Sequence, residues 1–339
     1  MIKSEIIIKQ KGKISGDIMI NFAVIGGFWL TDEFTKAIKE SEGVRYYAQY
    51  SRKIEKAEEY GKARGAVKYY SDLRELANDK DIDAVYIASP NRYHYEQSKL
   101  MINAGKHVLC EKPITPTTDE FKELSELADK KGVIYSEAMM NIHHPCIKEL
   151  KNLIDSSGEI VHVRFDFDQR SSKLEKWKSG ESFSTFSKSS FGGAIMDLGV
   201  YVTSLATYLF GMPADVFALG HFNKDGADMK DTFVLIYDDF EVVCTISKLA
   251  ESSIRSEILC DKNVITFDNI SRLENIVSHG ENEMIISNNN SFVECMKHEI
   301  SDLKTYIEGG REEYIINRGY TEMSVNLLEK LRKKTGYII

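Results

Sequence analysis

Short apolar runs alternate with longer amphipathic segments from Met19 onward, and this alternation constrains the fold more than any other feature of the sequence. The amphipathic segments predict helices, and the one that begins at Thr117 carries Glu120 three residues later, as in a capping box. Six apolar runs predict strands: Phe22–Ile25, Val44–Tyr50, Val67–Tyr70, Ala84–Ala88, His107–Cys110 and Val133–Ser136. Strands and helices that alternate in this way form a doubly wound parallel sheet, which we expect over residues 19–138.

The pattern changes after Glu137. One helix is expected over about Cys146–Ile154, and two more, Phe292–Glu308 and Tyr320–Lys334, close the chain. Between them we expect strands joined by short polar turns: Ile160–Asp168, Val216–Phe222, Thr232–Tyr237, Val242–Leu249 and Ile254–Cys260. In the first of these strands, the side chains at alternate positions 161, 163, 165 and 167 are expected to face one side. Residues 139–339 are therefore expected to form a second α/β domain with an open, mostly antiparallel sheet.

Composition bounds the class of protein. The 339 residues include 44 Lys and Arg against 52 Asp and Glu, a net charge of -8 without a basic block, which argues against nucleic-acid or anionic-membrane partners. No apolar run reaches the roughly 20 residues of a membrane helix, and the N-terminus lacks a signal-peptide core. Five scattered cysteines without a CxxC pair are typical of a reduced protein, so we expect a cytoplasmic location. Residues 1–18 are expected to be a poorly ordered extension, although an added strand is an alternative.

The turn after the first predicted strand sits where a dinucleotide fingerprint, G-x-G-x-x-G, would lie. Gly26 takes the first glycine position, whereas Phe28 and Thr31 take the second and third. The free amides of the following helix remain, so this turn could still hold a pyrophosphate. The candidate cofactor residues here are Gly26, Gly27, Phe28, Trp29 and Leu30. Taken alone, the motif leaves dinucleotide binding and an ordinary strand–helix turn equally open.

The second strand ends in Ser51, Arg52 and Lys53 and supplies no acid for a ribose 2′-hydroxyl. A hydroxyl followed by two cations suits a 2′-phosphate, which arginine can bind through charge-assisted hydrogen bonds. We therefore expect NADP rather than NAD, with NAD still possible. The alternative is that Ser51 only caps the helix near Ile54 and that both cations are solvated.

A lysine follows the fifth strand directly. Because Pro113 restricts the backbone of the residue before it, Lys112 is expected to be held at the carboxyl end of the sheet. There, its ammonium could bind a substrate hydroxyl and lower the pKa of that hydroxyl. A surface Lys-Pro turn is the alternative.

Four motifs in order carry a specific resemblance. Glu111-Lys112-Pro113, preceded by Ala88-Ser89-Pro90-Asn91 and His94, resembles the Gfo/Idh/MocA family of nicotinamide-dependent oxidoreductases. The segment Glu137 to Pro145 resembles that family's E-A-x-M-x-x-x-H-P motif, and Gly192 to Tyr201 resembles its G-G-A-x-x-D-x-G-x-(H/Y) motif. Tyr201, where many members have histidine, points to the branch with glucose-fructose oxidoreductase and dimeric dihydrodiol dehydrogenase.

The resemblance implies a Rossmann domain, a site between the two domains, and a homodimer or homotetramer formed through the C-terminal sheet. It implies that Lys112 binds the reacting oxygen, that Tyr201 exchanges its proton and that Asp197 orients the substrate or the lysine. The further residues it implies are Ser89, Pro90, Asn91, His94 and Glu111 beside the cofactor, and His144 beside the substrate. Separately, the Ser- and Lys-rich stretch 170–190 is expected to shape the substrate pocket, which makes its tryptophan, Trp177, a further candidate substrate residue. For Trp177, stacking on a sugar and anchoring its loop stay open, and Tyr201 could instead be a core residue.

Tyr201 follows Asp197 by four residues at the start of a predicted helix, which would put both on one face. A phenol needs a nearby cation to ionise near neutral pH, and Lys112 could supply it. No metal site is expected, because His143 and His144 are adjacent and would point different ways on a helix.

The sequence departs from the family pattern at Phe28, Thr31, Ile142 and Phe191. The resemblance and these departures together leave two possible functions. The first is an NAD(P)-dependent oxidoreductase that acts on a hydroxyl or carbonyl of a sugar, cyclitol or trans-dihydrodiol. The second, motivated by the missing glycines, is a non-catalytic protein that senses a dinucleotide or a sugar.

Overall fold

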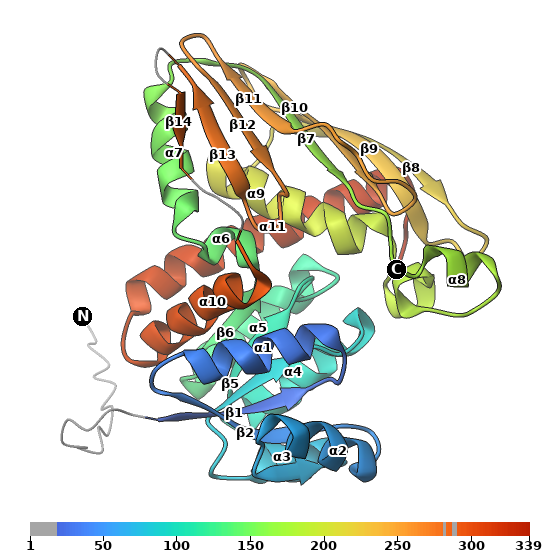
Figure 1. Cartoon of the computed structure of the whole chain (residues 1–339), viewed down its shortest axis with the longest axis vertical. Helices are drawn as coiled ribbons and strands as arrows, with labels where there is room; N and C mark the ends of the chain where they lie inside the picture. The colour runs from blue at the N-terminus through green and yellow to red at the C-terminus, as the bar shows by residue number, and fades with distance from the viewer. Residues whose placement is uncertain (1–18, 281–282, 287–289) are drawn as a thin grey trace, which may run out of the picture.

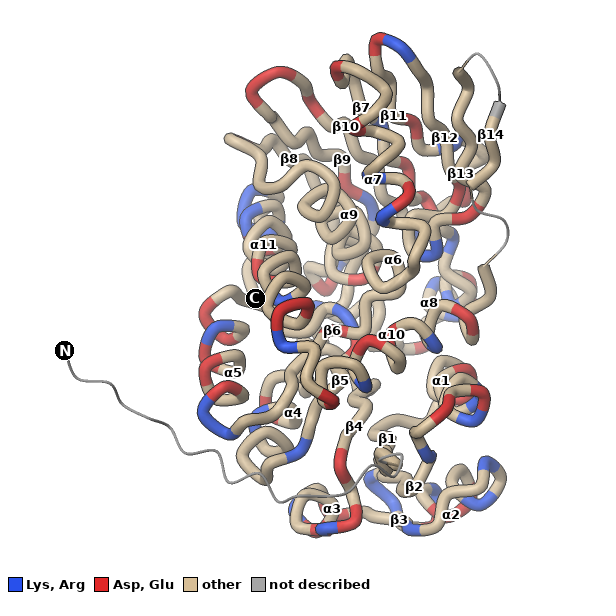
Figure 2. The backbone as a smooth tube through the Cα atoms, turned by 90° about the vertical axis from the view of Figure 1, so that its left-hand side faces the viewer, with Lys and Arg blue, Asp and Glu red and all other residues tan. Residues whose placement is uncertain are grey.

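The computed structural model describes residues 19–280, 283–286 and 290–339. The predicted extension, residues 1–18, lies outside the described residues. Two sheets lie one above the other along the long axis, with β1 to β6 in the lower part and β7 to β14 in the upper part (Figure 1). The view turned by 90° shows the same separation, with acidic and basic residues mixed along helices such as α2 and α5 (Figure 2).

The lower sheet has the order β3-β2-β1-β4-β5-β6 among the described residues, and all its pairs are parallel. Its strands are β1 (Ile20–Ile25), β2 (Val44–Tyr50), β3 (Lys68–Tyr70), β4 (Ala84–Ile87), β5 (His107–Glu111) and β6 (Tyr135–Ala138). Its helices are α1 (Trp29–Glu40), α2 (Ile54–Arg64), α3 (Leu73–Asn78), α4 (His94–Asn103) and α5 (Thr118–Lys131). The order reverses at β1, which is the switch point of a doubly wound fold, and the predicted fold class is confirmed.

The predicted range of the sixth strand is wrong. It spans Tyr135–Ala138 rather than Val133–Ser136, because Gly132 ends α5 in the left-handed conformation and Val133 bonds back to the helix through its amide. The two apolar residues after the glycine are buried in this connection, so their hydrophobicity suggested a strand. The predicted N-cap at Thr117 is correct, since its hydroxyl accepts from the amide of Glu120 at 3.3 Å.

The upper sheet has the order β14-β13-β12-β11-β7-β10-β9-β8 within the described chain. Only its β7–β10 pair is parallel there, so the sheet is mixed and mostly antiparallel, as predicted. Its strands are β7 (Ile160–Asp168), β8 (Asp215–Phe222), β9 (Asp228–Ile236), β10 (Glu241–Ser247), β11 (Ser256–Cys260), β12 (Val264–Asp268), β13 (Glu274–His279) and β14 (Glu283–Ile285). The remaining helices are α6 (Met140–His143), α7 (Cys146–Ser156), α8 (Leu174–Lys178), α9 (Val200–Phe210), α10 (Phe292–Ile307) and α11 (Arg311–Thr335).

The second half differs from expectation in several bounds. Strand β9 begins at Asp228 rather than Thr232, β10 ends at Ser247 rather than Leu249, and β11 begins at Ser256 rather than Ile254. Val161 is 55% exposed at the start of β7, so only the later members of its alternating set, from Val163 on, are buried. The last helix begins at Arg311 rather than Tyr320, because Gly319 weakens the periodic signal without ending the helix.

Helices α9 and α11 lie against one face of the upper sheet (Figure 1), and α9 is nearly wholly buried. The apolar helical stretch Lys188–Phe210 is long enough to cross a membrane, but 83% of its apolar window is buried inside the protein. Helix α10 instead packs in the core of the lower sheet through residues such as Met296, Ile300 and Leu303. The proposed division after residue 138 therefore stays a prediction, since a late helix of the chain completes the core of the first sheet.

The turn before α9 is packed so tightly that only glycine fits. A Cβ atom on Gly192 would lie 2.2 Å from the backbone oxygen of Ser184, and one on Gly193 would lie 2.0 Å from Oδ1 of Asp228. Gly193 also has a φ of +123°, which side chains rarely adopt. Close backbone packing, rather than flexibility, accounts for the two glycines.

We expect Gly192→Ala to destabilise the protein by about 1–3 kcal/mol, because the added methyl group meets backbone that cannot move aside cheaply. Gly319→Ala is the matched control, since its Cβ meets nothing within 4 Å. This helical position is exposed, so the control should stabilise the protein by about 0.5–1 kcal/mol. Urea unfolding of both variants checks the opposite signs, and a stable Gly192→Ala protein would contradict this account of the turn.

Candidate active site

Lys112 follows β5 directly and points across to the second half of the chain. Its Nζ atom lies 2.7 Å from Oδ1 and 2.8 Å from the backbone oxygen of Asp197. The same Nζ atom lies 4.6 Å from the ring centroid of Tyr201, within the range of a cation–π contact. The structure therefore brings the three predicted chemical residues together, and the lysine is not a surface turn residue.

Asp197 lies in a π-helical turn, Ile195–Gly199, that runs directly into α9. Such turns are rare and occur frequently at functional sites. Asp197 and Tyr201 both contact Lys112, which confirms that the two side chains share one side of this helical segment. The Asp197 side chain is 39% exposed, so a small molecule can still reach its carboxylate.

A second lysine completes the cluster, and sequence reasoning missed it. Lys248 follows β10 and forms an ion pair through Nζ with Oδ2 of Asp197. Its side chain is only 4% exposed, and its ammonium lies 5.8 Å from the ring centroid of Phe186. The available signal was a charged residue at the end of an apolar strand, but nothing in the sequence linked it to Asp197.

The two ammonium groups control the charge of Asp197. Burial by itself would raise the pKa of this carboxyl, but Lys112 and Lys248 hold the pKa well below its usual range. Burial would likewise lower the pKa of Lys112, but Asp197 and the neighbouring Tyr201 and Glu111 keep that pKa above its ordinary value. Carboxylate and ammonium groups therefore both stay charged around neutral pH.

The Tyr201 phenol behaves differently from expectation. Burial raises the pKa of Tyr201 above its ordinary value, and the nearby Lys112 offsets this only in part. The prediction that the lysine brings this pKa towards neutrality is therefore wrong for the protein without ligands, and the phenol keeps its proton. The ring is held edge-on against Phe167 at 5.8 Å, and Asn141 donates from Nδ2 to the Tyr201 backbone oxygen at 3.0 Å.

Three buried glutamates lie behind the lysine. Tyr86 donates to Oε1 of Glu111 at 2.5 Å, and burial raises the pKa of Glu111 to about 7. Burial also raises the pKa of Glu137 to about 7, although its Oε1 accepts from the amide of Ile114 at 2.9 Å. Glu299 of α10 is buried without a hydrogen-bond partner for either oxygen among the described residues, and burial raises its pKa well above normal. The protonation of Glu111 and Glu137 affects how much negative charge lies near Lys112.

The turn between β1 and α1 retains the features that an anion needs. Gly26 has a φ of +140°, and a Cβ there would lie 2.7 Å from the backbone oxygen of Ala88, which directly follows the neighbouring strand β4. Gln49 ties this turn to β2 by donating from Nε2 to the Gly26 backbone oxygen at 2.5 Å. Within the described chain, the amides of Trp29 and Leu30 at the start of α1 have no hydrogen-bond partner.

Phe28 and Thr31 stand where the second and third glycines are expected, and neither distorts this turn. Phe28 has φ -152°, an extended conformation open to any residue, and is 41% exposed. The hydroxyl of Thr31 accepts from the Phe28 amide at 3.0 Å and donates to the Phe28 oxygen at 2.7 Å. Trp29 packs edge-on against Phe292 of α10, with ring centroids 5.0 Å apart. Gly27 lies against Tyr60, whose ring a Cβ would meet at 3.3 Å.

The end of β2 leaves two cations available. Helix α2 begins at Ile54 with Lys53 as its N-cap and no side-chain cap, so the alternative that Ser51 caps the helix is wrong. The Ser51 amide donates to the backbone oxygen of Tyr70 at 3.1 Å. Arg52 and Lys53 are exposed beside it.

The segment after β4 contacts the second half of the chain. Asn91 donates from Nδ2 to the backbone oxygen of Phe191 at 2.8 Å, and Ser89 donates to Gln97 at 2.7 Å. His94 is buried, with Nδ1 2.9 Å from the oxygen of Pro113 and Nε2 2.8 Å from that of Ser89. Its ring therefore faces backbone oxygens of the two loops instead of an open site. Pro90, which precedes Asn91, is exposed.

The two predicted substrate residues outside this cluster have other neighbours. The ring of His144 lies edge-on to His298 of α10 at 5.0 Å, and its Nδ1 accepts from the amide of Cys146 at 3.2 Å. Trp177 lies 5.1 Å from Phe186 and belongs to a small cluster around Leu174. These contacts favour the alternative that Trp177 anchors its loop.

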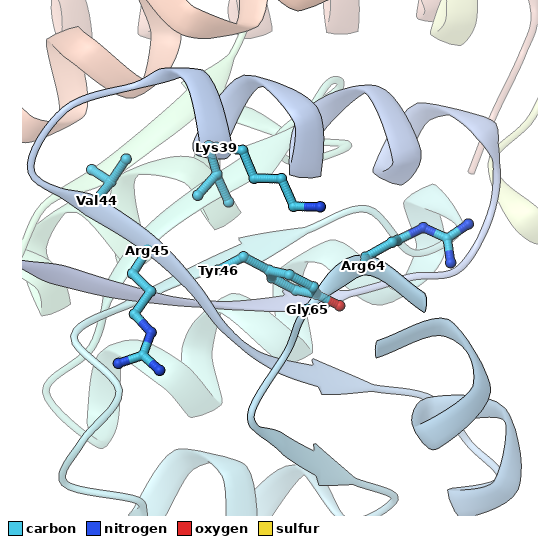
Figure 3. Close-up of a pocket in the computed structure, with 7 residues that line it drawn as sticks. Lys39, Val44, Arg45, Tyr46, Arg64 and Gly65 are labelled. Atoms are coloured by element: carbon cyan, nitrogen blue, oxygen red, sulfur yellow. The ribbon is translucent and has the colours of Figure 1, made fainter. Parts of the chain in front are cut away.

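No group of three or more metal-ligating side chains occurs in the part of the chain that the structure describes. A hollow of about 300 Å³ lies between the end of α1, the start of β2 and the end of α2 (Figure 3). Its cations are Lys39, Arg45 and Arg64, and Arg64 is paired with Asp32 at 2.5 Å. Because it lies at the amino end of β2, it is separate from the predicted cofactor residues at the carboxyl ends.

Comparisons with known proteins identify the family of the chain. Residues 20–139 match the model "Oxidoreductase family, NAD-binding Rossmann fold", and residues 147–266 match "GFO/IDH/MocA C-terminal domain". The chain is 36% identical to scyllo-inositol 2-dehydrogenase (NADP(+)) IolU of Bacillus subtilis (strain 168) over 326 residues, 94% of this chain and 98% of that protein.

It is also 23% identical to trans-1,2-dihydrobenzene-1,2-diol dehydrogenase of Mus musculus over 336 residues, 94% and 97% of the two chains. A solved structure of aldose-aldose oxidoreductase from Caulobacter crescentus, complexed with glycerol, shares the fold with a TM-score of 0.80. It is 20% identical, with 94% of this chain and 98% of that chain covered. The chain thus belongs to the Gfo/Idh/MocA family of oxidoreductases, in which an NAD-binding Rossmann fold precedes the family's C-terminal domain.

Proposed function

We propose that this protein is an NADP-dependent dehydrogenase or reductase that acts on a ring hydroxyl or carbonyl of a cyclic polyol. Cyclitols come first as the substrate class, ahead of sugars and trans-dihydrodiols, because the relative that is 36% identical along nearly its whole length is named for scyllo-inositol and NADP. We place the reaction in the cytoplasm. The observation that carries the proposal is the convergence of Lys112, Tyr201, Asp197 and Lys248 on one partly exposed position.

The residues present fit the nicotinamide cofactor of the family. The unpartnered amides of Trp29 and Leu30 at the start of α1 would hold the pyrophosphate. Ser51 and Arg52 would hold the 2′-phosphate of NADP, because no acid at the end of β2 opposes it. The bound cofactor supplies or accepts the hydride. Asn91, which already bridges to the second half of the chain, would meet its nicotinamide side.

Lys112, Asp197 and Tyr201 divide the remaining work. Lys112 donates a hydrogen bond to the reacting oxygen and stabilises negative charge on it. Asp197, fixed between two ammonium groups, orients Lys112 and accepts a hydrogen bond from a neighbouring substrate hydroxyl. Tyr201 holds the exchangeable proton on its phenolic oxygen. Because that phenol is protonated around neutral pH, it is ready to donate during carbonyl reduction.

We also propose that two copies of the chain associate through the outer face of the upper sheet. Phe217 and Leu219 on β8 are 63% and 54% exposed, and helices cover the opposite face (Figure 1). Phe217 is directly opposite Val234, which is directly opposite Val243, so an apolar row crosses three strands. Such a continuous apolar row suits burial against a second copy.

The function is tested by titrating the purified protein with NADPH and NADH and then measuring turnover of scyllo-inositol, other inositols, D-xylose and a trans-dihydrodiol. Lys112→Met and Tyr201→Phe should each lower kcat by about 100-fold or more and leave the NADPH Kd within a few-fold, because both act on the reacting oxygen. Lys130→Met, on the exposed end of α5, is the matched control. Binding of NADPH without turnover across the panel would favour the sensing protein, and full activity of either variant would refute the role of that residue.

Arg52→Ala should weaken binding of NADPH by about tenfold or more and leave NADH binding nearly unchanged, because a charge-assisted hydrogen bond to the 2′-phosphate is lost. Lys130→Ala controls for the loss of one positive charge far from β2. Fluorescence titrations with both cofactors provide the measurement. Equal losses for NADPH and NADH would show that Arg52 does not read the 2′-phosphate.

Phe217→Asp should shift the protein from dimer or tetramer towards monomer, because a carboxylate would have to be buried in the proposed interface. Ile315→Asp on α11 is the control, since Ile315 is 48% exposed but lies outside the apolar row. Size-exclusion chromatography with light scattering reports the mass of each. An unchanged mass for Phe217→Asp, or a monomeric unmodified protein, would rule out this interface.

A further inference from the structure

Two acids that the proposed function does not use lie on β9. Asp228 and Asp231 are 0% and 3% exposed, although residues three apart on a regular strand would face opposite sides of the sheet. The pairing of β8 with β9 shifts register between His221 and Phe222, so the strand is irregular where Asp228 lies. This irregularity lets both carboxyl groups lie on the buried side.

One oxygen of the pair holds the turn that precedes α9. Oδ2 of Asp228 accepts from the backbone amide of Ile195 at 2.5 Å. The other three oxygens of the pair are buried, and outside the pair none has a hydrogen-bond donor among the described residues. The two carboxyl groups lie within hydrogen-bonding reach of each other. A buried carboxylate without donors is unfavourable, and two of them in contact repel each other as well.

The surrounding glycines make space for these two acids. A Cβ on Gly193 would lie 2.0 Å from Oδ1 of Asp228, and a Cβ on Gly220 would lie 2.6 Å from Oδ1 of Asp231. The second glycine of the Gly192-Gly193 turn is therefore required by Asp228. The turn and the pair are fitted to each other.

Few charged groups face the pair. Lys248 attracts Asp228, but its ammonium is already paired with Asp197. The buried Tyr337 phenol is near enough for Asp228 to raise its pKa, and it donates to the backbone oxygen of Gly192. Burial, together with the charge of Asp228, raises the pKa of Asp231 to about 10, and burial raises the pKa of Asp228 as well. The burial of the pair and its lack of outside donors both favour a state in which one of the two acids is protonated.

We propose that Asp228 and Asp231 share one proton and that this carboxyl–carboxylate pair fixes the turn Gly193–Ile195, so that the two acids position Asp197 and Tyr201. The Asp231 carboxyl donates to Asp228, and Asp228 accepts from the Ile195 amide at the start of the π-helical turn. Both acids are positioning residues, because neither contacts the reacting groups. Their importance for turnover rests on the function proposed above, whereas the shared proton does not.

The first test is thermal unfolding of the full chain between about pH 5 and pH 9, with no substrate present. An unfolded aspartate has a pKa of about 3.9, so the unfolded chain has released this proton over the whole range, whereas the folded protein holds it. Folding of the unmodified protein therefore takes up a proton. Its stability is therefore lost progressively as pH rises towards the raised folded pKa. Asp231→Asn has no such proton, and its amide can still donate to Asp228.

The Tm of Asp231→Asn should accordingly rise by several degrees relative to the unmodified protein as pH increases over this range. Asp225→Asn, an exposed residue in the same β8–β9 connection, should track the unmodified protein. A constant difference between Asp231→Asn and the unmodified protein would overturn the shared proton. If Asp231→Asn does not fold, infrared spectroscopy of the unmodified protein with isotope-labelled aspartate decides: a protonated carboxyl band at pH 7 supports the pair, and its absence overturns it.

The second test addresses positioning. With an active substrate, Asp231→Asn should keep kcat within about twofold, whereas Asp231→Ala should lose about tenfold or more with an unchanged Kd for NADPH. Rescue by asparagine alone supports positioning, and equal kcat values for the two variants would overturn it. If no substrate in the panel turns over, the proposed function fails while the unfolding and infrared results still decide the shared proton.

Discussion

The structure of the site depends on one carboxylate, Asp197, held between two buried ammonium groups. Lys112 and Lys248 come from different sheets, so Asp197 links the two halves of the chain as well as orienting the lysine. The three groups together carry one surplus positive charge. In the proposed function, this charge would stabilise negative charge on a substrate oxygen during proton and hydride exchange at a C–OH group. The phenol of Tyr201 stays neutral beside it and does not cancel that charge.

The layer behind Lys112 tunes this surplus charge. Burial raises the pKa of Glu111 and of Glu137 to about 7, and burial also raises the pKa of Glu299 well above its ordinary value. When the first two are protonated, Lys112 faces little negative charge apart from Asp197. As they ionise, the negative charge near Lys112 grows. Helix α10 packs against the first sheet and carries Glu299, so this packing affects the charge of the layer.

The sequence identified those parts of the site that short motifs encode. Lys112 is set by the proline after it, and Asp197 and Tyr201 by a four-residue spacing that survives in a π-helical turn. Lys248 could not be predicted, because its partner lies 51 residues away and only the folded sheet brings them together. The raised pKa of Tyr201 was missed for a related reason. A sequence shows that a cation is near, but not how far burial outweighs it.

The two missing glycines of the first turn motivated the sensing alternative. The backbone conformation explains why this turn does not need them. Phe28 has an extended backbone that needs no glycine, and Thr31 replaces the third glycine with two hydrogen bonds to the turn. Phe191 does adopt a left-handed conformation with φ +56°, which is costly for a phenylalanine. Its ring packs against the core, and Asn91 donates to its backbone oxygen, so this cost is offset by contacts that join the two halves of the chain. A broken glycine pattern therefore describes how this turn is built and gives no reason to expect that catalysis has been lost.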